Sequence, residues 1–461
     1  MESSQISRRD CSMRYELYKD SEIPWIGEIP SSWKLIPNKV LFKKRQIKVG
    51  EAYKNYQLLS LTTGGIKEKS IEDSRGKVPA SYSGYQEVRP HDMVLCLFDL
   101  DVSAVFSGIS KYNGMITSAY DVAECNELYI DEDYVDYWFQ YVFSNRYYKM
   151  YSKNVRYTIS FDAFGALKTP VPSIEEQKKI AHYLDWQVSK INSLIDTRKQ
   201  QVRLLREQRE IRISRIVKRG LDETRPLKDS GIDYIGKVPD HWQILLNGRL
   251  FEENSRKFEG DELVLSLSQK DGLLPYENMK ERSLHTASYD NWKLVLPNDL
   301  VLNRFKAHLG VFFASKYRGI VTFHYGVFVP KRDANSKYYE ALYHTTEYRT
   351  VYAGRSNGMT VGLQNLSNQN FYDVYTIYPP KEEQDAIVKE IEKVEQQTKE
   401  AIDAINDYID ILHELRSRII AEAVTGHIDV REIEVPDFEH IDEDIEIEND
   451  EELDESEEQE D

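Results

Sequence analysis

"KDSEIPWIGEIPSSWKLIPNKVLF", residues 19–42, is written a second time in this chain of 461 residues, as "KDSGIDYIGKVPDHWQILLNGRLF" at 228–251. Lys19, Gly27, Pro30 and Trp33 are among the residues that recur at an offset of 209. A single recurring phrase could be accidental, so its weight depends on whether other matches follow it in the same order.

Further matches do follow in order. "RPHDMVLCLF" at 89–98 corresponds to "LPNDLVLNRF" at 296–305, and "VPSIEEQKKI" at 171–180 corresponds to "YPPKEEQDAI" at 378–387, both at an offset of 207. A period of this length is too long for a solenoid repeat. We therefore expect one large unit used twice, which we call the first copy and the second copy, with an internal pseudo-twofold relation.

Each copy is predicted to be an α+β globular domain followed by a long helix. Short β-branched and apolar runs such as "HDMVLCLFDL" and "GIVTFHYGVFVP" predict strands. The proline and glutamate pair before each long polar–apolar stretch predicts a helix start, and Gly220 and Gly426 predict the ends. The expected order is an N-terminal segment 1–18, domain 19–172, helix 173–220, domain 221–379, helix 380–426 and a C-terminal segment 427–461.

The two long helices are predicted to pair with each other as an antiparallel coiled coil that separates the two domains. Each is about 65 Å long at 1.5 Å per residue. Residues 174–219 carry 12 basic and 6 acidic residues, whereas residues 380–422 carry 6 basic and 12 acidic ones. Apolar residues spaced by three and four predict a seam. Its members are Ile180, Leu184, Ile191, Ile195, Val202 and Leu205 on one helix and Ile387, Ile391, Val394, Ala401, Ile405, Leu412, Leu415 and Ile419 on the other. Packing of each helix on its own domain is the alternative.

Composition narrows the function classes. Of the net charge of −18, the segment 431–461 supplies most, with 18 acidic residues and one arginine, so the remainder is nearly neutral and an anionic partner is not excluded. That tail is expected to be disordered. Three cysteines without CxxC spacing, no apolar run of membrane-spanning length and no signal sequence favour a cytoplasmic protein without a metal site.

Signatures of catalysis are missing from the sequence. There is no GxxxxGK(S/T) phosphate loop, no S-adenosylmethionine loop and no HExxH spacing among the ten histidines. We therefore expect a chain that is not an enzyme by itself.

The phrases "KDSGIDYIGKVPDHWQI", "PSIEEQKKI", "PPKEEQDAI" and "AEAVTGHIDVR" resemble the specificity subunits of type I restriction–modification systems. The resemblance covers residues 14–431. It implies two target-recognition domains, each reading one half of a bipartite, asymmetric sequence in double-stranded DNA. It also implies that the paired helices fix the spacing between the halves and dock two methyltransferase subunits, which would bind S-adenosylmethionine in place of this chain. Motor–nuclease subunits would join for cleavage.

Loops rich in cationic, amide and aromatic residues are the candidates for DNA contact, because base edges and phosphates are read by such side chains. In the first copy they are Arg75, Lys77, Tyr82, Lys153, Asn154, Arg156 and Tyr157. In the second copy they are Asn303, Arg304, Lys306, His308, Arg355, Asn357 and Gln364. Ordinary surface exposure explains each single residue equally well. Trp33 and Trp242 are expected to pack inside their own domains.

Two other functions stay open on the sequence alone. The same duplicated domains could form a stand-alone DNA-binding regulator, or the chain could be a structural coiled-coil protein without a DNA target.

Overall fold

The computed structural model describes residues 14–62, 65–70, 81–101, 107–152, 157–254, 256–258, 261–269, 271–279, 289, 291–356 and 365–442, except for the side chain of His308. The chain divides into two compact units: unit 1 comprises Met1–Gln200 and Ile405–Asp461, and unit 2 comprises Gln201–Ala404. Each long helix therefore contributes one half to each unit.

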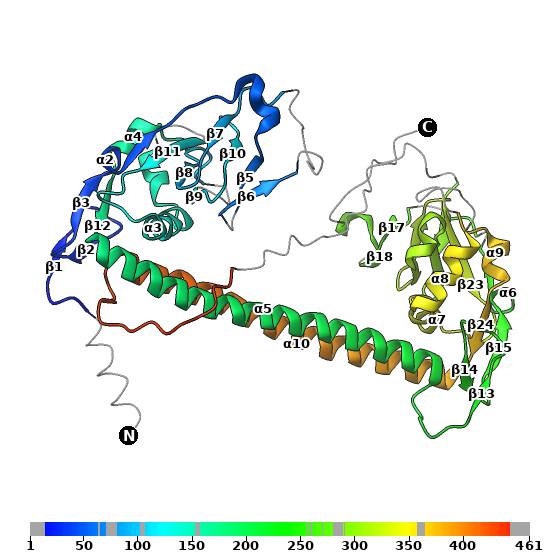
Figure 1. The fold of residues 1–461 in the computed structure, drawn as a ribbon. Helices are drawn as coiled ribbons and strands as arrows, with labels where there is room; N and C mark the ends of the chain where they lie inside the picture. Colours follow the sequence, from blue (N-terminus) through cyan, green and yellow to red (C-terminus); the bar gives the residue numbers. More distant parts are fainter. Residues whose placement is uncertain are drawn as a thin grey trace, which may run out of the picture. The chain divides into compact units, whose positions relative to one another are not determined.

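Unit 1 is built on two four-stranded sheets with α3 packed beside β9 (Figure 1). One sheet has the order β4-β11-β8-β9 and the other β6-β5-β10-β7, and the pairs β1-β2 and β3-β12 complete the unit. Its strands are β1 Tyr18–Asp20, β2 Glu28–Pro30, β3 Lys34–Pro37, β4 Phe42–Lys44, β5 Leu58–Thr62, β6 Gly65–Lys69, β7 Gln86–Val88, β8 Asp92–Leu95, β9 Ser107–Ile109, β10 Gly114–Ile116, β11 Asp121–Cys125 and β12 Lys168–Val171. Its helices are α2 Asn38–Leu41, η1 Gly50–Asn55, α3 Glu132–Ser144, η2 Tyr147–Tyr151, α4 Phe161–Ala166 and the first half of α5 Ile174–Arg219.

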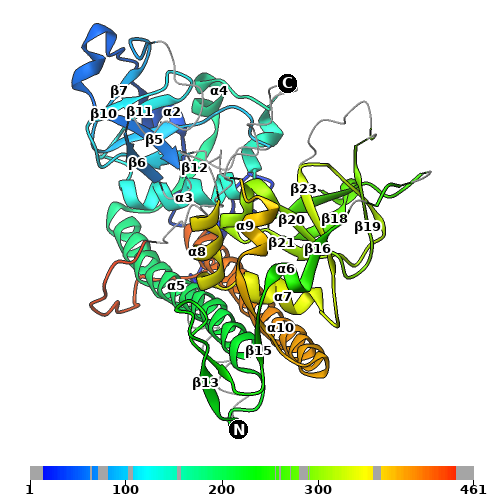
Figure 2. The same ribbon diagram turned by 90° about the vertical axis from the view of Figure 1, so that its right-hand side faces the viewer.

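Unit 2 repeats this plan, with α7 beside β21 (Figure 2). Its main sheet has the order β16-β23-β20-β21, and the pairs β13-β14, β15-β24, β17-β18 and β19-β22 follow the strand order of unit 1. Its strands are β13 Leu227–Asp229, β14 Lys237–Pro239, β15 Gln243–Leu246, β16 Phe251–Glu253, β17 Leu265–Ser268, β18 Gly272–Pro275, β19 Lys293–Val295, β20 Leu300–Asn303, β21 Phe312–Ala314, β22 Gly319–Val321, β23 Tyr325–Pro330 and β24 Tyr375–Tyr378. Its helices are α6 Asn247–Leu250, η3 Tyr276–Asn278, η4 Arg304–Leu309, α7 Ser336–Tyr343, α8 Thr346–Arg355, α9 Asn368–Tyr372 and the first half of α10 Lys381–Val424.

The register of the strands confirms the duplication. Lys34 pairs with Val171 and Gln243 pairs with Tyr378, so the pairs β3-β12 and β15-β24 carry matched residues. A parallel pairing between Met115 and Leu58 in unit 1 recurs as a parallel bridge between Val264 and Ile320 in unit 2. The predicted α+β class and internal repeat are therefore confirmed.

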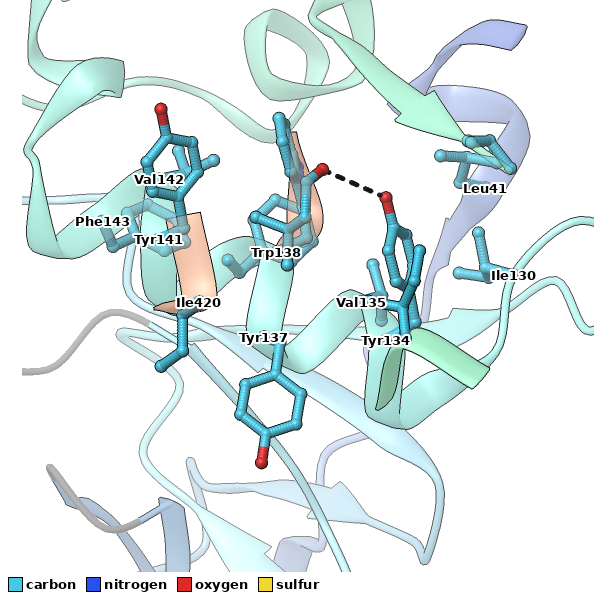
Figure 3. Packing of buried hydrophobic residues seen from close by; sticks show 14 of the residues in the cluster. Leu41, Ile130, Tyr134, Val135, Tyr137, Trp138, Tyr141, Val142, Phe143 and Ile420 are labelled. Carbon is cyan, nitrogen blue, oxygen red and sulfur yellow. Dashed lines mark hydrogen bonds between the residues drawn. The ribbon is translucent and has the colours of Figure 1, made fainter. Parts of the chain in front are cut away.

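The core of unit 1 joins α3 to the end of α10. Tyr134, Val135 and Trp138 of α3 are fully buried, and Ile420 of α10 belongs to the same cluster (Figure 3). The hydroxyl of Tyr134 donates to the carbonyl of Val424 at 3.5 Å. In unit 2 the third residue of α7, Tyr338, donates in the same way to the carbonyl of Val217 at 2.7 Å. Each unit thus holds the far end of the other copy's helix by an aromatic core.

The antiparallel pairing of the long helices is confirmed within each unit. In unit 1, Ile180 and Leu184 of α5 share a core with Ile420 of α10, and Ile191 and Ile195 contact Leu412. In unit 2, Ile216 and Val217 share a core with Ile387 and Ile391, and Arg212 forms an ion pair with Glu390 at 2.6 Å. Residues later in α5 therefore contact residues earlier in α10, which is the pattern of an antiparallel pair.

The heptad seam predicted for α10 is wrong in one respect. Leu415 is 43% exposed, whereas Ile409 and Ile419 pack in the cluster with Leu412. Buried or partly buried positions recur every eleven residues, as in Ile180, Ile191 and Val202 on α5 and in Ile387, Thr398, Ile409 and Ile420 on α10. A straight helix with 3.6 residues per turn drifts about 20° per heptad, so an eleven-residue spacing keeps its contact face in place where a seven-residue one does not.

The remaining seam predictions hold to different degrees. Ile180, Leu184, Ile191, Ile195, Val202, Ile387, Ile391, Val394 and Leu412 are buried, and Leu205, Ala401, Ile405 and Ile419 are half-buried. The predicted disorder of the acidic tail is wrong for residues 431–442, which pack along α5. The ring of Phe438 lies 5.5 Å from that of His182, and Asn192 donates to the carbonyl of Ile441 at 2.8 Å.

No helix in the described residues is both long enough and apolar enough to cross a membrane.

Candidate nucleic-acid interface

The repeated tryptophan anchors the globular part of each unit to a long helix. Trp33 is fully buried and its indole Nε1 donates to Glu176 Oε1 at 2.8 Å; Trp242 is fully buried and donates to Glu383 Oε2 at 2.9 Å. Ser173 caps α5 by accepting from the backbone N of Glu176 at 3.3 Å. The side chain of Glu176 is thus used by the tryptophan and not by a reciprocal capping box.

The glutamine that follows each glutamate fixes a second helix. Gln177 accepts from the backbone N of Asp131, the N-cap of α3, at 2.7 Å, and it donates to the carbonyl of Pro172 at 3.0 Å. In unit 2, Gln384 accepts from the backbone N of Asn335, the N-cap of α7, at 2.8 Å. The recurrence of the Glu-Glu-Gln triplet therefore reflects a junction that joins each long helix to the shorter helix α3 or α7 of the same unit.

The far end of the opposite helix closes the same junction. Gly220 ends α5 with φ +76° and lies against Trp242, and Gly426 follows α10 with φ +76° and lies against Pro30 and Trp33. A Cβ at Gly426 would stand 2.4 Å from Pro30 Cδ, so the close approach as well as the left-handed backbone requires glycine.

The predicted contacts of the first copy fall mostly outside the described residues, namely Arg75, Lys77, Lys153, Asn154 and Arg156. Two others are described. Tyr82 is 6% exposed and packs with Val49, Leu58 and Met115, so it serves the core and does not offer its ring to a ligand. Tyr157 is half-buried in a left-handed backbone conformation (φ 44°), with Lys149 Nζ 4.2 Å from its ring centroid.

In the second copy the structure brings several predicted residues to one place. Asn303 ends β20 and caps η4 by accepting from the backbone N of Phe305 at 3.1 Å. Arg304 and Lys306 follow within η4, and Arg355 ends α8 with its side chain exposed. The carbonyl of Arg355 accepts from Asn370 at 2.7 Å. The side chain of His308, and all of Asn357 and Gln364, lie outside the described residues.

Glu253 organises the charges beside η4. Its Oε1 accepts from Arg304 at 2.7 Å and from Lys293 at 3.1 Å, and its Oε2 accepts from Asn368. The side chain of Arg304 is only 15% exposed and is paired with Glu253, so in this structure its main role is to hold the loop in place. Two cations share one carboxylate, which leaves this edge of the sheet net positive.

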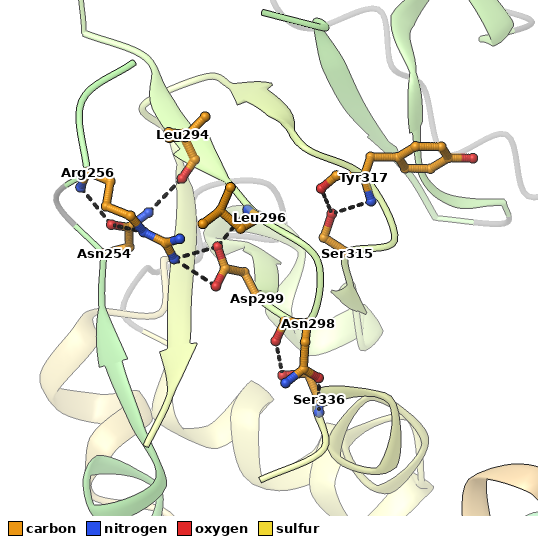
Figure 4. Close-up of polar contacts among 9 residues, drawn as sticks. All are labelled: Asn254, Arg256, Leu294, Leu296, Asn298, Asp299, Ser315, Tyr317 and Ser336. Atoms are coloured by element: carbon orange, nitrogen blue, oxygen red, sulfur yellow. Dashed lines mark hydrogen bonds and ion pairs between the residues drawn. The ribbon is translucent and has the colours of Figure 1, made fainter. Parts of the chain in front are cut away.

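A polar network holds the turn that leads into β20 (Figure 4). Arg256 donates to both carboxylate oxygens of Asp299 at 2.8 and 2.7 Å, and Asn254 accepts from the Arg256 backbone at 2.6 Å. Burial raises the pKa of Asp299, and the guanidinium of Arg256 opposes that shift. Asn298, in a left-handed conformation (φ 70°), accepts from the backbone N of Ser336 at 2.9 Å and thereby joins this turn to α7.

One exposed aromatic turn was missed in the sequence. Phe323 and His324, between β22 and β23, are exposed, and their ring centroids lie 3.9 Å apart. Phe305 of η4 lies 6.0 Å from His324 and is 40% exposed. Aligning "GIVTFHY" at 319–325 with "GMITSAY" at 114–120 would have identified this pair as a difference between the copies.

An open groove of about 1220 Å³ also lies within unit 2, between the long helices and α7. Cations such as Arg215 and Lys218 alternate along it with carboxylates such as Glu340 and Glu347. The groove therefore lacks the excess of positive charge that DNA binding requires. Burial raises the pKa of Glu340 to about 7 and lowers that of His344 to about 4. No cluster of three metal-ligating side chains occurs in the part of the chain that the structure describes.

Comparison with known proteins places this geometry in context. Residues 241–409 match a family model described as the type I restriction modification DNA specificity domain. Among solved structures, a chain from work on the complex assembly and conformational transition of the type I R-M system matches with 14% identity and a TM-score of 0.53, over 86% of this chain and 99% of that one. At this identity the likeness supports the fold alone.

A second solved structure, the HsdS subunit from Thermoanaerobacter tengcongensis, matches with 13% identity and a TM-score of 0.44, over 86% of this chain and 98% of that one.

Proposed function

We propose that this chain, whose residues 241–409 match the type I restriction modification DNA specificity domain, is a member of that family and reads a bipartite, asymmetric target in double-stranded DNA for a methyltransferase complex. Each recognition unit reads one half of the target, and the paired helices α5 and α10 fix the separation between the halves.

The observation that carries this proposal is the duplication. The family match falls on residues 241–409, in the second copy, and the main sheet of the first copy has the same strand order. The pairing of β4 with β11, in which Phe42 faces Cys125, recurs where Phe251 faces Pro330. Because the loops of the two copies differ, two different half-sites follow from the same scaffold.

Exposed apolar residues on the long helices support docking of partner proteins. Leu204 on α5 is 56% exposed and Ile411 on α10 is 58% exposed. They occupy matched positions, 207 residues apart, one in each unit. Two equivalent apolar positions suit two copies of one partner, for which the methyltransferase subunit is the candidate.

The chemistry is assigned to those partners. S-adenosylmethionine binds in the methyltransferase subunits, this chain contributes no catalytic group, and motor–nuclease subunits join the complex where DNA is also cleaved. The site of action is the cytoplasm, where the DNA is.

The test is reconstitution. The chain is co-expressed with its methyltransferase subunits, genomic DNA is exposed to the complex with S-adenosylmethionine, and methylated adenines are mapped. We expect methylation at one bipartite motif, and only when both polypeptides are present. Methylation by the partner alone at the same motif contradicts the proposal.

The same experiment separates the alternatives. A stand-alone regulator would select a DNA sequence from a random pool without the methyltransferase, and a structural coiled-coil protein would select none with or without it.

A further inference from the structure

The second copy carries an aromatic turn that the first copy lacks at the same place. The runs "GMITSAY" (114–120) and "GIVTFHY" (319–325) end one strand and begin the next. Tyr120 donates its backbone N to the carbonyl of Thr117 at 3.3 Å, and Tyr325 donates to Thr322 at 3.1 Å. Both are therefore hydrogen-bonded four-residue turns, with Ser118–Ala119 at the tip of one and Phe323–His324 at the tip of the other.

The aromatic rings at the tip are exposed together. Phe323 is 51% exposed and lies against His324, and the ring of Phe305, 40% exposed, approaches His324 from η4. In the first copy the residue matched to Phe305, Phe98, stacks on Tyr120 at 5.9 Å beside the buried core of the sheet. Three aromatic side chains in contact on the surface are not explained by packing within unit 2.

The base of the turn is positively charged in the second copy only. Lys293 donates to the carbonyl of Tyr325 at 2.8 Å, where the matched Gln86 of the first copy donates to Tyr120 at 2.6 Å. Arg304 and Lys306 flank Phe305, and the first copy has Leu97 and Asp99 at these positions. At the positions of Glu253, Lys293, Arg304 and Lys306 the second copy carries three cations and one carboxylate, whereas the first carries Lys44 and Asp99 with two neutral residues.

We propose that Phe323 and His324, supported by Phe305, form an aromatic wedge that inserts at a base step of the DNA half-site read by the second copy. This inference deepens the proposed function and rests on it. Apolar and aromatic side chains placed at the tip of a turn can enter a base step, partly unstack it and kink the duplex. The excess of positive charge beside the wedge, where Lys293 and Arg304 share the single carboxylate of Glu253, attracts the phosphates of the kinked duplex.

Duplex DNA is favoured over a protein partner as the occupant for two reasons. The rings lie beside the cation-rich loop Asn303–Lys306, and charge complementarity there suits phosphates. The matched apolar positions on the long helices, Leu204 and Ile411, already supply two equivalent surfaces for protein subunits. The asymmetry of the wedge between the copies also agrees with an asymmetric target.

The experiment uses the chain in complex with its methyltransferase subunits and a duplex that carries the mapped target. The fluorescent base 2-aminopurine is placed in turn at each step of the two half-sites. With the unsubstituted chain, we expect fluorescence to rise at one step of the second half-site, because unstacking relieves quenching. The double substitution F323S/H324A converts this turn into that of the first copy.

F323S/H324A is expected to abolish the fluorescence rise and to weaken binding about 10- to 100-fold, the usual loss when a base-stacking aromatic residue is removed. F323W/H324Y keeps aromatic rings at both positions and should retain most of both signals. Ser118→Ala in the first copy is the matched control and should change neither. Circular dichroism and the melting temperature verify that the variants are folded.

Three outcomes overturn the inference. The first is that F323S/H324A binds DNA and unstacks the base as the unsubstituted chain does. The second is that it loses the methyltransferase subunits in a pull-down without DNA, which would make the turn a protein-docking surface. The third is that F323W/H324Y fails like F323S/H324A while folded. If the unsubstituted complex selects no DNA sequence at all, the proposed function itself fails, and this result is distinct from the other three.

Discussion

Trp33 and Trp242 show at the scale of single residues why the repeated phrase is repeated. Each indole binds the second glutamate of a Glu-Glu-Gln triplet and also contacts the glycine that ends the opposite helix. One buried residue thus links a recognition unit to two helices, and its hydrogen bond to a charged carboxylate is the kind that contributes most.

Replacing Glu176 by Gln should lower the free energy of unfolding by about 1.5–3 kcal/mol, because the bond from Trp33 and that from Tyr15 both lose a charged acceptor. Glu383→Gln should act similarly through Trp242. The neighbouring Glu175 is exposed, so Glu175→Gln is the control and should change the unfolding midpoint in urea little. Equal effects of the two substitutions at 175 and 176 would contradict the role of Glu176.

Glu340 gives the protein a pH-dependent stability. Its pKa is raised to about 7 in the folded chain from an ordinary value of 4.5, so between these values the folded state binds more protons than the unfolded state. The free energy of unfolding therefore falls as pH rises from 4.5 to 7 through this group. Glu340→Gln should flatten that part of the profile, measured as urea midpoints at each pH, while exposed Glu382→Gln should leave it unchanged.

Single residues also show which structural roles can be predicted from the sequence and which cannot. The burial of both tryptophans and the role of Gly220 and Gly426 could be predicted, since turn chemistry and aromatic burial are local. The burial of Tyr82 could not, because its partners Val49 and Met115 are distant in sequence. The exposure of Phe323 could not be predicted, because hydrophobic periodicity identifies buried faces of helices and strands and does not indicate which residues at the tip of a turn are exposed.

At the scale of elements, α5 and α10 were predicted to within a residue or two because their apolar spacing extends over more than forty residues. Their partner and direction followed from length and charge. Which residues of α10 lie in the seam toward its end could not be predicted, because a seven-residue and an eleven-residue spacing differ by one position only after several turns. That one position decides that Leu415 is exposed.

The outward apolar positions predict how the helices bind a partner. Leu204→Glu and Ile411→Glu should each weaken binding of the methyltransferase subunit about tenfold or more, because a charge replaces an apolar contact of the interface. If two subunits dock as proposed, the pull-down stoichiometry should fall from two subunits to one for either single substitution. Leu128, which is 84% exposed and is not part of either long helix, provides the control Leu128→Glu.

Retention of both partner subunits by the double variant L204E/I411E would contradict the docking role of these helices. Both substituted side chains are already exposed, so the long helices should stay folded in these variants. Circular dichroism checks that a loss of partner binding is not caused by unfolding.

At the scale of the whole molecule, the C-terminal segment completes unit 1. Val430 is 1% exposed in the core, Arg431 lies 4.8 Å over the ring of Tyr15, and Ile441 accepts from Asn192 at 2.8 Å. The body of the protein therefore includes the beginning of what composition alone marks as an acidic tail.

Two truncations test this division. Removing residues 443–461 should leave the melting temperature unchanged, whereas removing residues 431–461 should lower it by roughly 2–6 °C, since contacts worth about 1–2 kcal/mol are lost from a unit of this size. Scanning calorimetry measures both. Equal melting temperatures for the two truncations would show that residues 431–442 contribute nothing to unit 1.

Gly426 against Trp33 has a consequence for biosynthesis. Unit 2 is one continuous stretch, Gln201–Ala404, but unit 1 joins Met1–Gln200 to Ile405–Asp461. During synthesis, unit 1 therefore remains incomplete until residues after 404 have been made, and unit 2 can fold before it. A polypeptide whose synthesis stops before residue 424 would carry one completed unit and one open aromatic core, which chaperones and proteases could recognise.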